Sequence, residues 1–345
     1  MNSKFEANLN NIKKRIEFID IAKGIAILCI IMGHMEIKTI NTVVFTFHVP
    51  IFFIISGYFI KSKKENNDLI KSMSKTLLLP YIITCLFVII NTIISQIFSG
   101  YCEGINYTIL RLTLSSFFGS GYRTSYFFNI EPIGAIWFLL ALFWAKLLFN
   151  IIIDRKEKLI YVIIFFLIGY ISAKFIWLPF SIQSGLVAVL FIYLGNLIKE
   201  FDLFSKLNKK NTLILFVIWL VTLIIGFEFN GFDTMSLVKC KFTFIPLNII
   251  SAVFGSLTII GISKYIENIK TISKPLMFLG KNSLIVMCFH LIELNTIPFK
   301  KIISIFVNNE HLIITITALV KILWCSFGIL LCKYIKVMKK VFNYK

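Results

Sequence analysis

The chain has 345 residues, of which 58% are hydrophobic and only 15% are charged, and its mean hydropathy is +0.85. A soluble domain averages about 45–50% apolar and about 25% charged residues, so this composition excludes an ordinary soluble protein. The net charge of +19 is high enough to suggest nucleic-acid binding, but the distribution of the basic residues along the chain explains it as membrane topology.

Apolar runs of bilayer length recur along the whole chain. They predict an all-α, polytopic integral membrane protein with about ten transmembrane helices, because one helical span needs about 20 apolar residues. Few residues remain for a separate soluble domain. The expected spans are 18–37, 43–60, 76–98, 133–153, 159–176, 182–198, 212–227, 243–263, 278–297 and 312–335.

The Lys and Arg residues are concentrated in alternate loops. With the N-terminus in the cytoplasm, the predicted inside segments hold 24 of the 36 Lys and Arg residues, and the outside segments hold eight. Cytoplasmic loops are enriched in these residues, so the bias places both termini inside and removes the argument for a nucleic-acid partner. We expect a cytoplasmic segment at 1–17, a membrane domain at 18–335 and a basic cytoplasmic tail at 336–345.

The first predicted span carries ionisable side chains that a plain anchor avoids, because a charge at the centre of a span costs about 2.5–3.5 kcal/mol on insertion scales. Helical geometry places Lys23 and His34 about 20° apart around the helix and about 16 Å apart along it. Asp20 lies within about 60° of Lys23. One helix face therefore carries a cation near one surface and an imidazole near the other, a geometry that can line a cavity.

Each of these side chains also has a structural explanation. Lys23 lies near the helix start and can extend its amine to the cytoplasmic headgroups while pairing with Asp20 at i,i+3. His34 can be a histidine of the outer interface. Neither explanation accounts for the shared helix face, so the functional interpretation stays open beside them.

The second predicted span carries another histidine and a proline. His48 lies at a depth similar to that of His34, and the sequence allows the two imidazoles to meet across a hairpin at 38–43. Pro50 cannot donate a hydrogen bond to the preceding turn, and the freed carbonyl is tolerated where it faces protein or a cavity. The alternative is a kinked, aromatic-rich helix that only packs.

Later spans place three more candidates. Ser283 and His290 share a face but lie about 10 Å apart along the axis, whereas a nucleophile and its base need about 2.6–3.2 Å. His290 and Glu293, at i,i+3, can contact each other, and a satisfied polar contact between helices is the structural alternative. Trp137 opens the fourth span, where an aromatic-belt residue is also expected.

Together these residues resemble the acyltransferase 3 family of membrane O-acyltransferases, in particular its fucose-acetylase-like and surface-polysaccharide acetylase branch. Lys23 with His34 matches the family's Arg/Lys-x10-His in the first span. Some branches follow the fourth-span Trp motif with a glutamate, which this chain lacks. The other matching stretches are Phe-His-Val-Pro-Ile-Phe-Phe-Ile-Ile-Ser-Gly over 47–57, Trp-Phe-Leu from 137, and Leu-Gly-Lys-Asn-Ser-Leu over 279–284 with His290.

The resemblance implies transfer of an acetyl or other acyl group from cytoplasmic acetyl-CoA to a hydroxyl of a cell-envelope or exported glycan, without a metal. Lys23 is then expected to meet a CoA phosphate, with Asp20 positioning it. His34 is expected either to take the proton of the acceptor hydroxyl or to carry the acyl group, with His48 orienting base or acceptor. Substrate binding is expected from Ser56, Trp137, Ser283 and His290.

A transporter or flippase for a glycan or lipid-linked precursor is the alternative function, because ionisable residues inside the membrane also mark transport pathways. Such a protein is expected to show paired broken helices or internal repeats. The sequence shows no clear pairing of this kind, and a transport function does not explain why Lys23 and His34 share one face of the first helix.

Cysteine usage and overall composition give the remaining expectations. The seven cysteines have no zinc-type spacing, and Cys102 and Cys240 fall in different outside loops, where a disulfide stays open. The first apolar run has no cleavage site behind it, so no signal peptide is expected. Abundant Lys, Ile and Asn with only four Arg indicate a bacterial protein, which we expect in the cytoplasmic membrane. The sequence makes no prediction of oligomeric state.

Overall fold

The computed structural model describes residues 16–35, 37–100, 104–125, 129–230 and 235–344, without the side chains of residues 229 and 230. In this part of the chain the regular structure is helical, apart from two isolated β-bridges, Thr124–Ile130 and Ser236–Lys241. The prediction of an all-α protein is confirmed.

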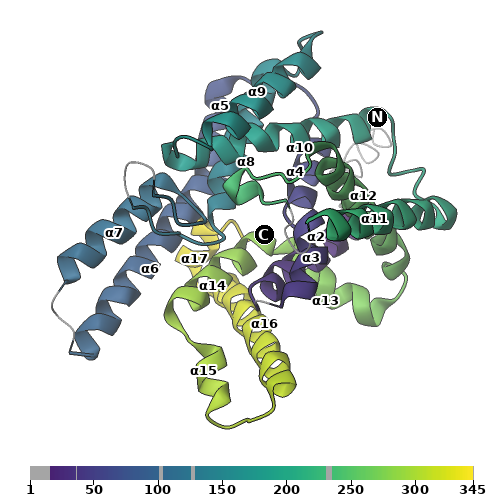
Figure 1. The fold of residues 1–345 in the computed structure, drawn as a ribbon. Helices are drawn as coiled ribbons and strands as arrows, with labels where there is room; N and C mark the ends of the chain where they lie inside the picture. The colour runs from purple at the N-terminus through teal and green to yellow at the C-terminus, as the bar shows by residue number, and fades with distance from the viewer. Residues whose placement is uncertain (1–15, 36, 101–103, 126–128, 231–234, 345) are drawn as a thin grey trace, which may run out of the picture.

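The helices follow one another along the chain as Figure 1 shows. Their bounds are α2 Glu17–Gly33, α3 Lys38–Phe47, α4 Pro50–Tyr58, α5 Asn66–Met73, the π-helical turn η1 Ser74–Leu78, α6 Leu79–Phe98, α7 Ile105–Phe118, α8 Trp137–Ile152, α9 Lys158–Ser172, the 3-10 turn η2 Pro179–Ser181, α10 Ile182–Glu200, α11 Lys209–Asn230, the 3-10 turn η3 Leu237–Lys239, α12 Ile245–Ile266, α13 Lys270–Lys281, α14 Ser283–Thr296, α15 Phe299–Ser304, α16 Glu310–Tyr334 and α17 Lys336–Val341.

Many of these helices have the length and composition of membrane spans. Within the described residues, six helical stretches are long and apolar enough to cross a membrane, or up to seven if the bent pair α13–α14 is one span. α8 and α9 are shorter apolar helices, and α2 has 17 residues. The helices support a multi-pass membrane protein, while the number of about ten crossings and the cytoplasmic termini stay predictions.

The turn between the first two spans differs from the sequence-based expectation. The hairpin predicted at 38–43 is wrong, because α3 is a helix from Lys38 to Phe47 and α2 already ends at Gly33. α3 and α4 are separate helices that meet at His48 and Val49. Pro50 is the first residue of α4, where its missing N–H removes no hydrogen bond that the helix needs.

The predicted ninth span is not one straight helix. α13 ends at Lys281 and α14 begins at Ser283, and the two axes differ by 75°. The sequence predicted one span over 278–297, so this bend is a correction of that span. Asn282 occupies the break with φ −110° and ψ 22°, outside the helical region, so α14 leaves α13 in a new direction.

α2 lies at the centre of the packing. It contacts α3, α4, α12, α13, α14 and α16, and its apolar residues are largely buried. Figure 1 shows α2 in purple behind α11 and α12, with α13 below it and α14 and α16 toward the lower side. Most side chains on α2 therefore face another helix or a space between helices.

Two helix pairs approach with backbones in contact. A Cβ added at Gly24 would clash with the carbonyl oxygen of Leu276, and one at Gly280 would clash with that of Asp20, so only glycine fits where α2 crosses α13. Gly57 and Gly195 play the same part between α4 and α10. Small residues of this kind let membrane helices pack closely.

The long connection between α6 and α8 contains a helix of its own. The helix is α7, from Ile105 to Phe118, and it packs along α6 (Figure 1). Tyr81 on α6 donates a hydrogen bond of 2.6 Å to the carbonyl oxygen of Ser116 on α7. The described part of this connection is therefore ordered.

Candidate functional site

A cavity of about 900 Å³ lies along one face of α2. α2 contributes Lys23, Ile27, Ile30 and His34 to its wall, which is the face that the spacing of the sequence predicts. The other walls come from α3, α4, α8, the segment 235–239 and the start of α14. The residues expected to share one helix face thus line one continuous space.

The cavity collects most of the residues singled out from the sequence. Asp20 and His290 are not on its wall; Asp20 lies beneath Lys23, and His290 lies behind His34. The predicted roles of all these residues stay predictions. The predicted residues on the wall are Lys23, His34, His48, Ser56, Trp137 and Ser283.

His34 combines exposure to the cavity with a position at the end of α2. It is the C-cap residue of this helix, and its side chain remains exposed at the wall of the cavity. The C-terminus of a helix carries a partial negative charge of about −0.5, which stabilises a cation placed there. This position suits an imidazole that takes up a proton during a reaction.

His48 presents a defined nitrogen to the cavity. Its Nδ1 lies 2.6 Å from the carbonyl oxygen of Val44, and a carbonyl only accepts, so Nδ1 carries the hydrogen. In the neutral ring, Nε2 is then the nitrogen that can accept a hydrogen bond. The ring also packs against Phe45, with 4.9 Å between centroids. His48 is therefore held by its own helix.

Lys23 is held from below and open on its other side. Its Nζ lies 2.8 Å from Oδ1 of Asp20, and the two side chains are 22% and 3% exposed. The pairing at i,i+3 that the sequence suggested is confirmed. Because Asp20 is buried and Lys23 reaches the cavity, the carboxylate fixes the direction of the amine while the amine still faces the cavity.

The wall of the cavity is basic. Its described residues include no Asp or Glu, so its field favours anionic groups. One of its cations, Lys146 on α8, was not singled out from the sequence, although its charge within a predicted span is the same kind of signal that identified Lys23. The cationic residues on the wall are Lys23, Lys38, Lys146 and Lys239.

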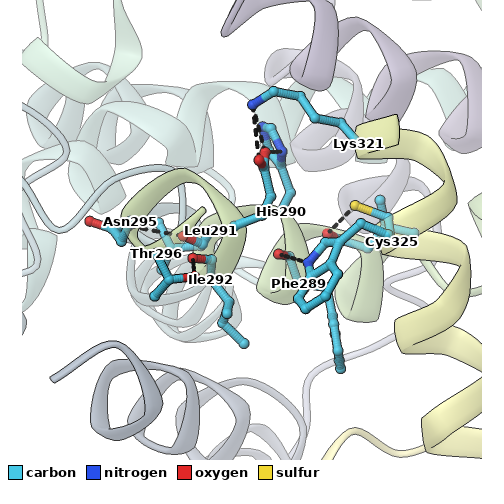
Figure 2. Close-up of polar contacts among 11 residues, drawn as sticks. Phe289, His290, Leu291, Ile292, Asn295, Thr296, Lys321 and Cys325 are labelled. Atoms are coloured by element: carbon cyan, nitrogen blue, oxygen red, sulfur yellow. Dashed lines mark hydrogen bonds and ion pairs between the residues drawn. The ribbon is translucent and has the colours of Figure 1, made fainter. Parts of the chain in front are cut away.

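A buried polar cluster lies behind His34. Lys321 on α16 places its Nζ 2.7 and 3.1 Å from the two carboxylate oxygens of Glu293 on α14. Nδ1 of His290 lies 2.8 Å from Oε1 of the same carboxylate. Figure 2 shows Lys321 reaching across from α16 toward His290. The imidazole rings of His290 and His34 are 5.1 Å apart between centroids.

The sequence analysis found only part of this cluster. The contact between His290 and Glu293 is confirmed, but Lys321 and the approach of His290 to His34 were missed. Lys321 lies within the predicted span 312–335 and was detectable by the same argument on buried charge. The approach of the two rings was not detectable, because it depends on the bend between α13 and α14.

The possible disulfide between Cys102 and Cys240 stays a prediction. Cys102 lies outside the described residues. Cys240 is buried, and its Sγ lies 3.9 Å from the hydroxyl of Ser184. Its surroundings are therefore those of a small buried side chain.

Comparison with known proteins identifies the family of the chain. The model of a protein family described as an acyltransferase domain matches residues 16–336, which is nearly all of the chain. No curated protein and no solved structure matches the chain. The family match, over apolar helices that surround an intramembrane cavity, shows that the chain belongs to the acyltransferase 3 family and is a multi-pass membrane acyltransferase.

Proposed function

We propose that this acyltransferase moves an acetyl group from acetyl-CoA to a hydroxyl of a cell-envelope or exported glycan, and that the transfer occurs at His34. The observation that carries the proposal is a single cavity whose wall holds Lys23 and His34 on the same helix face. A cation and a base, separated by about 16 Å, suit a long donor with an anionic end and a reactive thioester end.

The donor would bind along α2 with its phosphates at the basic part of the wall. Lys23 and Lys146 are amine donors there, and ammonium groups form strong hydrogen bonds with phosphate oxygens. The separation of about 16 Å between Lys23 and His34 is of the order of the extended pantetheine arm. The apolar residues Ile27 and Ile30 lie between these two residues on the wall, where an uncharged arm would run.

The chemistry follows from the position of His34. The acceptor hydroxyl oxygen attacks the carbonyl carbon of the thioester while neutral His34 takes the hydroxyl proton. The new C–O ester bond forms as the C–S bond breaks, and the CoA thiolate leaves. The thiolate then takes the proton from His34, which restores the neutral base. The partial charge at the end of α2 stabilises the transient imidazolium.

The acceptor would be held on the side of the cavity opposite α2. His48 offers Nε2 as an acceptor that can orient the sugar hydroxyl. Ser56 and Ser283 add hydroxyl groups, and Trp137 adds an aromatic surface of the kind that packs against sugar rings. With both termini in the cytoplasm of a bacterium, the donor would enter from inside and the glycan from outside the cytoplasmic membrane.

One observation favours the alternative of a transporter for a glycan or lipid-linked precursor. Transporter substrate sites are often built from discontinuous helices. Here the bent pair α13–α14 brings Ser283 to the cavity wall. The two functions differ in product, because an enzyme forms an acyl ester and a transporter delivers unmodified substrate.

The test uses the full chain in membrane vesicles with acetyl-CoA labelled in the acetyl group and envelope glycan as acceptor. We expect label in the glycan as an alkali-labile ester, and loss of this label with His34→Ala at equal protein abundance. Arg123→Gln, which removes an exposed ion pair with Glu131, is the matched control and should label as the parent does. Transport of unlabelled glycan without ester formation by the parent protein would overturn the proposal.

A further inference from the structure

We propose that His290, Glu293 and Lys321 act together as a positioning unit for His34, in which the ion pair between α14 and α16 fixes the ring of His290 and His290 orients the ring of His34. None of the three side chains reaches the cavity wall, so they are positioning residues rather than catalytic ones. The inference rests on the proposed acyl transfer at His34 and revises the substrate contact expected for His290.

The first argument is that Glu293 and Lys321 form an ion pair in a buried place where two apolar side chains are the usual choice. The side chains of Glu293 and Lys321 are 0% and 8% exposed. Replacing a buried ion pair by apolar residues of similar size is often neutral or stabilising, because desolvation offsets the attraction between the charges. The pair is therefore poorly explained as a contribution to stability, and a role in fixing geometry explains it better.

The second argument is the direction that the pair gives to His290. Lys321 contacts both carboxylate oxygens, at 2.7 and 3.1 Å, which holds the carboxylate in one orientation. Oε1 then faces Nδ1 of His290 at 2.8 Å. A carboxylate only accepts hydrogen bonds, so it favours the ring form with hydrogen on Nδ1. In that form Nε2 is free to accept.

The third argument is an unsatisfied atom. Both ring nitrogens of His290 are buried without a hydrogen bond of standard geometry among the described residues, but Nδ1 lies 2.8 Å from the carboxylate of Glu293. Nε2 is therefore the nitrogen without a polar neighbour, and such an atom in a folded protein requires an explanation. The ring that packs against His290 is His34, at 5.1 Å between centroids. In the neutral form of His34 whose hydrogen lies on the nitrogen toward His290, Nε2 of His290 accepts that N–H, and the other ring nitrogen of His34 is left as the base. A base oriented by a third group is a recurrent arrangement in transferases and hydrolases.

The fourth argument is that the unit is mechanically fixed. Trp324 Nε1 donates to the carbonyl oxygen of Phe289 at 3.0 Å, and Cys325 Sγ lies 3.7 Å from the carbonyl oxygen of Val286. Both contacts join α16 to α14 close to Lys321 (Figure 2). The amine of Lys321 is therefore presented from a rigid helix interface rather than from a mobile one.

The experiment separates positioning from structure through charge-neutral substitution. Glu293→Gln or Lys321→Met alone leaves an unpaired buried charge, and loss of folding would then mask any effect on rate. The double variant Glu293→Gln/Lys321→Met leaves no buried charge. We expect it to reach the parent's membrane abundance. Its kcat should fall at least tenfold, which corresponds to about 1.4 kcal/mol of transition-state stabilisation, while its KM for acetyl-CoA should change less than about twofold.

Ser326→Ala is the matched control on α16, because the hydroxyl of Ser326 bonds only to the carbonyl oxygen of Ile322 in its own helix at 2.8 Å. It should keep the parent's kcat. A folded double variant whose kcat lies within twofold of the parent's would overturn the inference. The activity of the parent protein tests the proposed function by itself. If the parent transfers acetyl and the double variant is unaffected, only the present inference is contradicted and the proposed function stands.

A spectroscopic readout does not depend on activity or on the double variant's yield. The chain has four histidines, so ¹⁵N-histidine labelling reports on four rings with two nitrogens each, and His311→Asn, His48→Asn and His34→Asn assign the signals of all four rings. Lys321→Arg keeps the charge and should leave all signals in place. Glu293→Asp withdraws the carboxylate by one methylene, and we expect it to shift the ring-nitrogen signals of both His290 and His34. A shift confined to His290 would contradict the positioning of His34.

Discussion

The two carboxylate–lysine pairs in the helices around the cavity are alike in distance and different in construction. Asp20 and Lys23 belong to consecutive turns of α2 and lie 2.8 Å apart, with the lysine side chain 22% exposed. Glu293 and Lys321 come from two helices and lie 2.7 Å apart, with the lysine 8% exposed. The first pair opens onto the cavity, and the second is closed inside the helix packing.

The difference teaches what each pair can do. A pair within one helix needs no partner helix, so its lysine is free to meet a ligand while the carboxylate holds it in place. A pair between helices joins them at one register and leaves its lysine no access to a ligand. We therefore propose that the amine of the first pair serves binding and that the carboxylate of the second serves the neighbouring histidine, which it contacts.

The largest effect should come from the proposed base, His34, which the pair between α14 and α16 is proposed to position and which shares a helix face with Lys23. His34→Ala removes the proposed base, and general base catalysis contributes about 10²–10⁴-fold to a rate. We expect acetyl transfer to fall by about this factor at unchanged membrane abundance, measured as initial rate with labelled acetyl-CoA. A folded variant that transfers at the parent's rate would show that His34 is not the base and that the pair between α14 and α16 does not serve catalysis through it.

The closed pair should be the more sensitive to loss of one partner. Glu293→Gln leaves the amine of Lys321 charged and buried, which costs about 3–5 kcal/mol of unfolding free energy. We expect a clear fall in the thermal unfolding temperature of the protein in detergent. The double variant Glu293→Gln/Lys321→Met should recover most of this loss. An unchanged unfolding temperature for the single variant would mean that the pair is not closed to water.

The open pair should lose less stability under the same change. Asp20→Asn leaves Lys23 with access to water in the cavity, so we expect a loss of about 1–3 kcal/mol, below that of Glu293→Gln. The same thermal measurement compares the two variants directly. A larger loss for Asp20→Asn would reverse the comparison and make the pair on α2 the structural one.

The smallest effect should fall on binding alone. Lys146→Gln removes a cation of the cavity wall, and we expect KM for acetyl-CoA to rise about tenfold, equivalent to about 1.4 kcal/mol, with kcat unchanged. Lys274→Gln, at an exposed position of α13, is the control and should change neither constant. A fall in kcat without a change in KM would place Lys146 outside the donor's binding site.

Local periodicity was enough to predict the face of α2 that lines the cavity. Lys23 and His34 are related by helix geometry alone, and α2 runs unbroken from Glu17 to Gly33, so nothing intervenes to change their relation. The helical class and most span positions followed from hydropathy for the same reason. The turn after α2 was misplaced, because the sequence does not mark where α3 starts.

The missed residues divide into two kinds. Lys146 and Lys321 were detectable from the sequence. Most Lys and Arg residues lie in predicted loops, and the few lysines that lie inside predicted spans need a polar or charged partner there. They are Lys23, Lys146, Lys281 and Lys321. The position of His290 behind His34 was not detectable from one sequence, since it results from a 75° change of direction at Asn282 and from packing between helices far apart in the chain.

The glycine contacts set how the cavity can open. Gly24 and Gly280 bind α2 to α13, and Gly57 and Gly195 bind α4 to α10, in both cases with backbone against backbone. Helices in such contact have little room to slide, so each pair moves as one body. A bulky donor that enters or leaves would then widen the space between these two bodies, and the reacting groups on α2 would keep their spacing throughout the catalytic cycle.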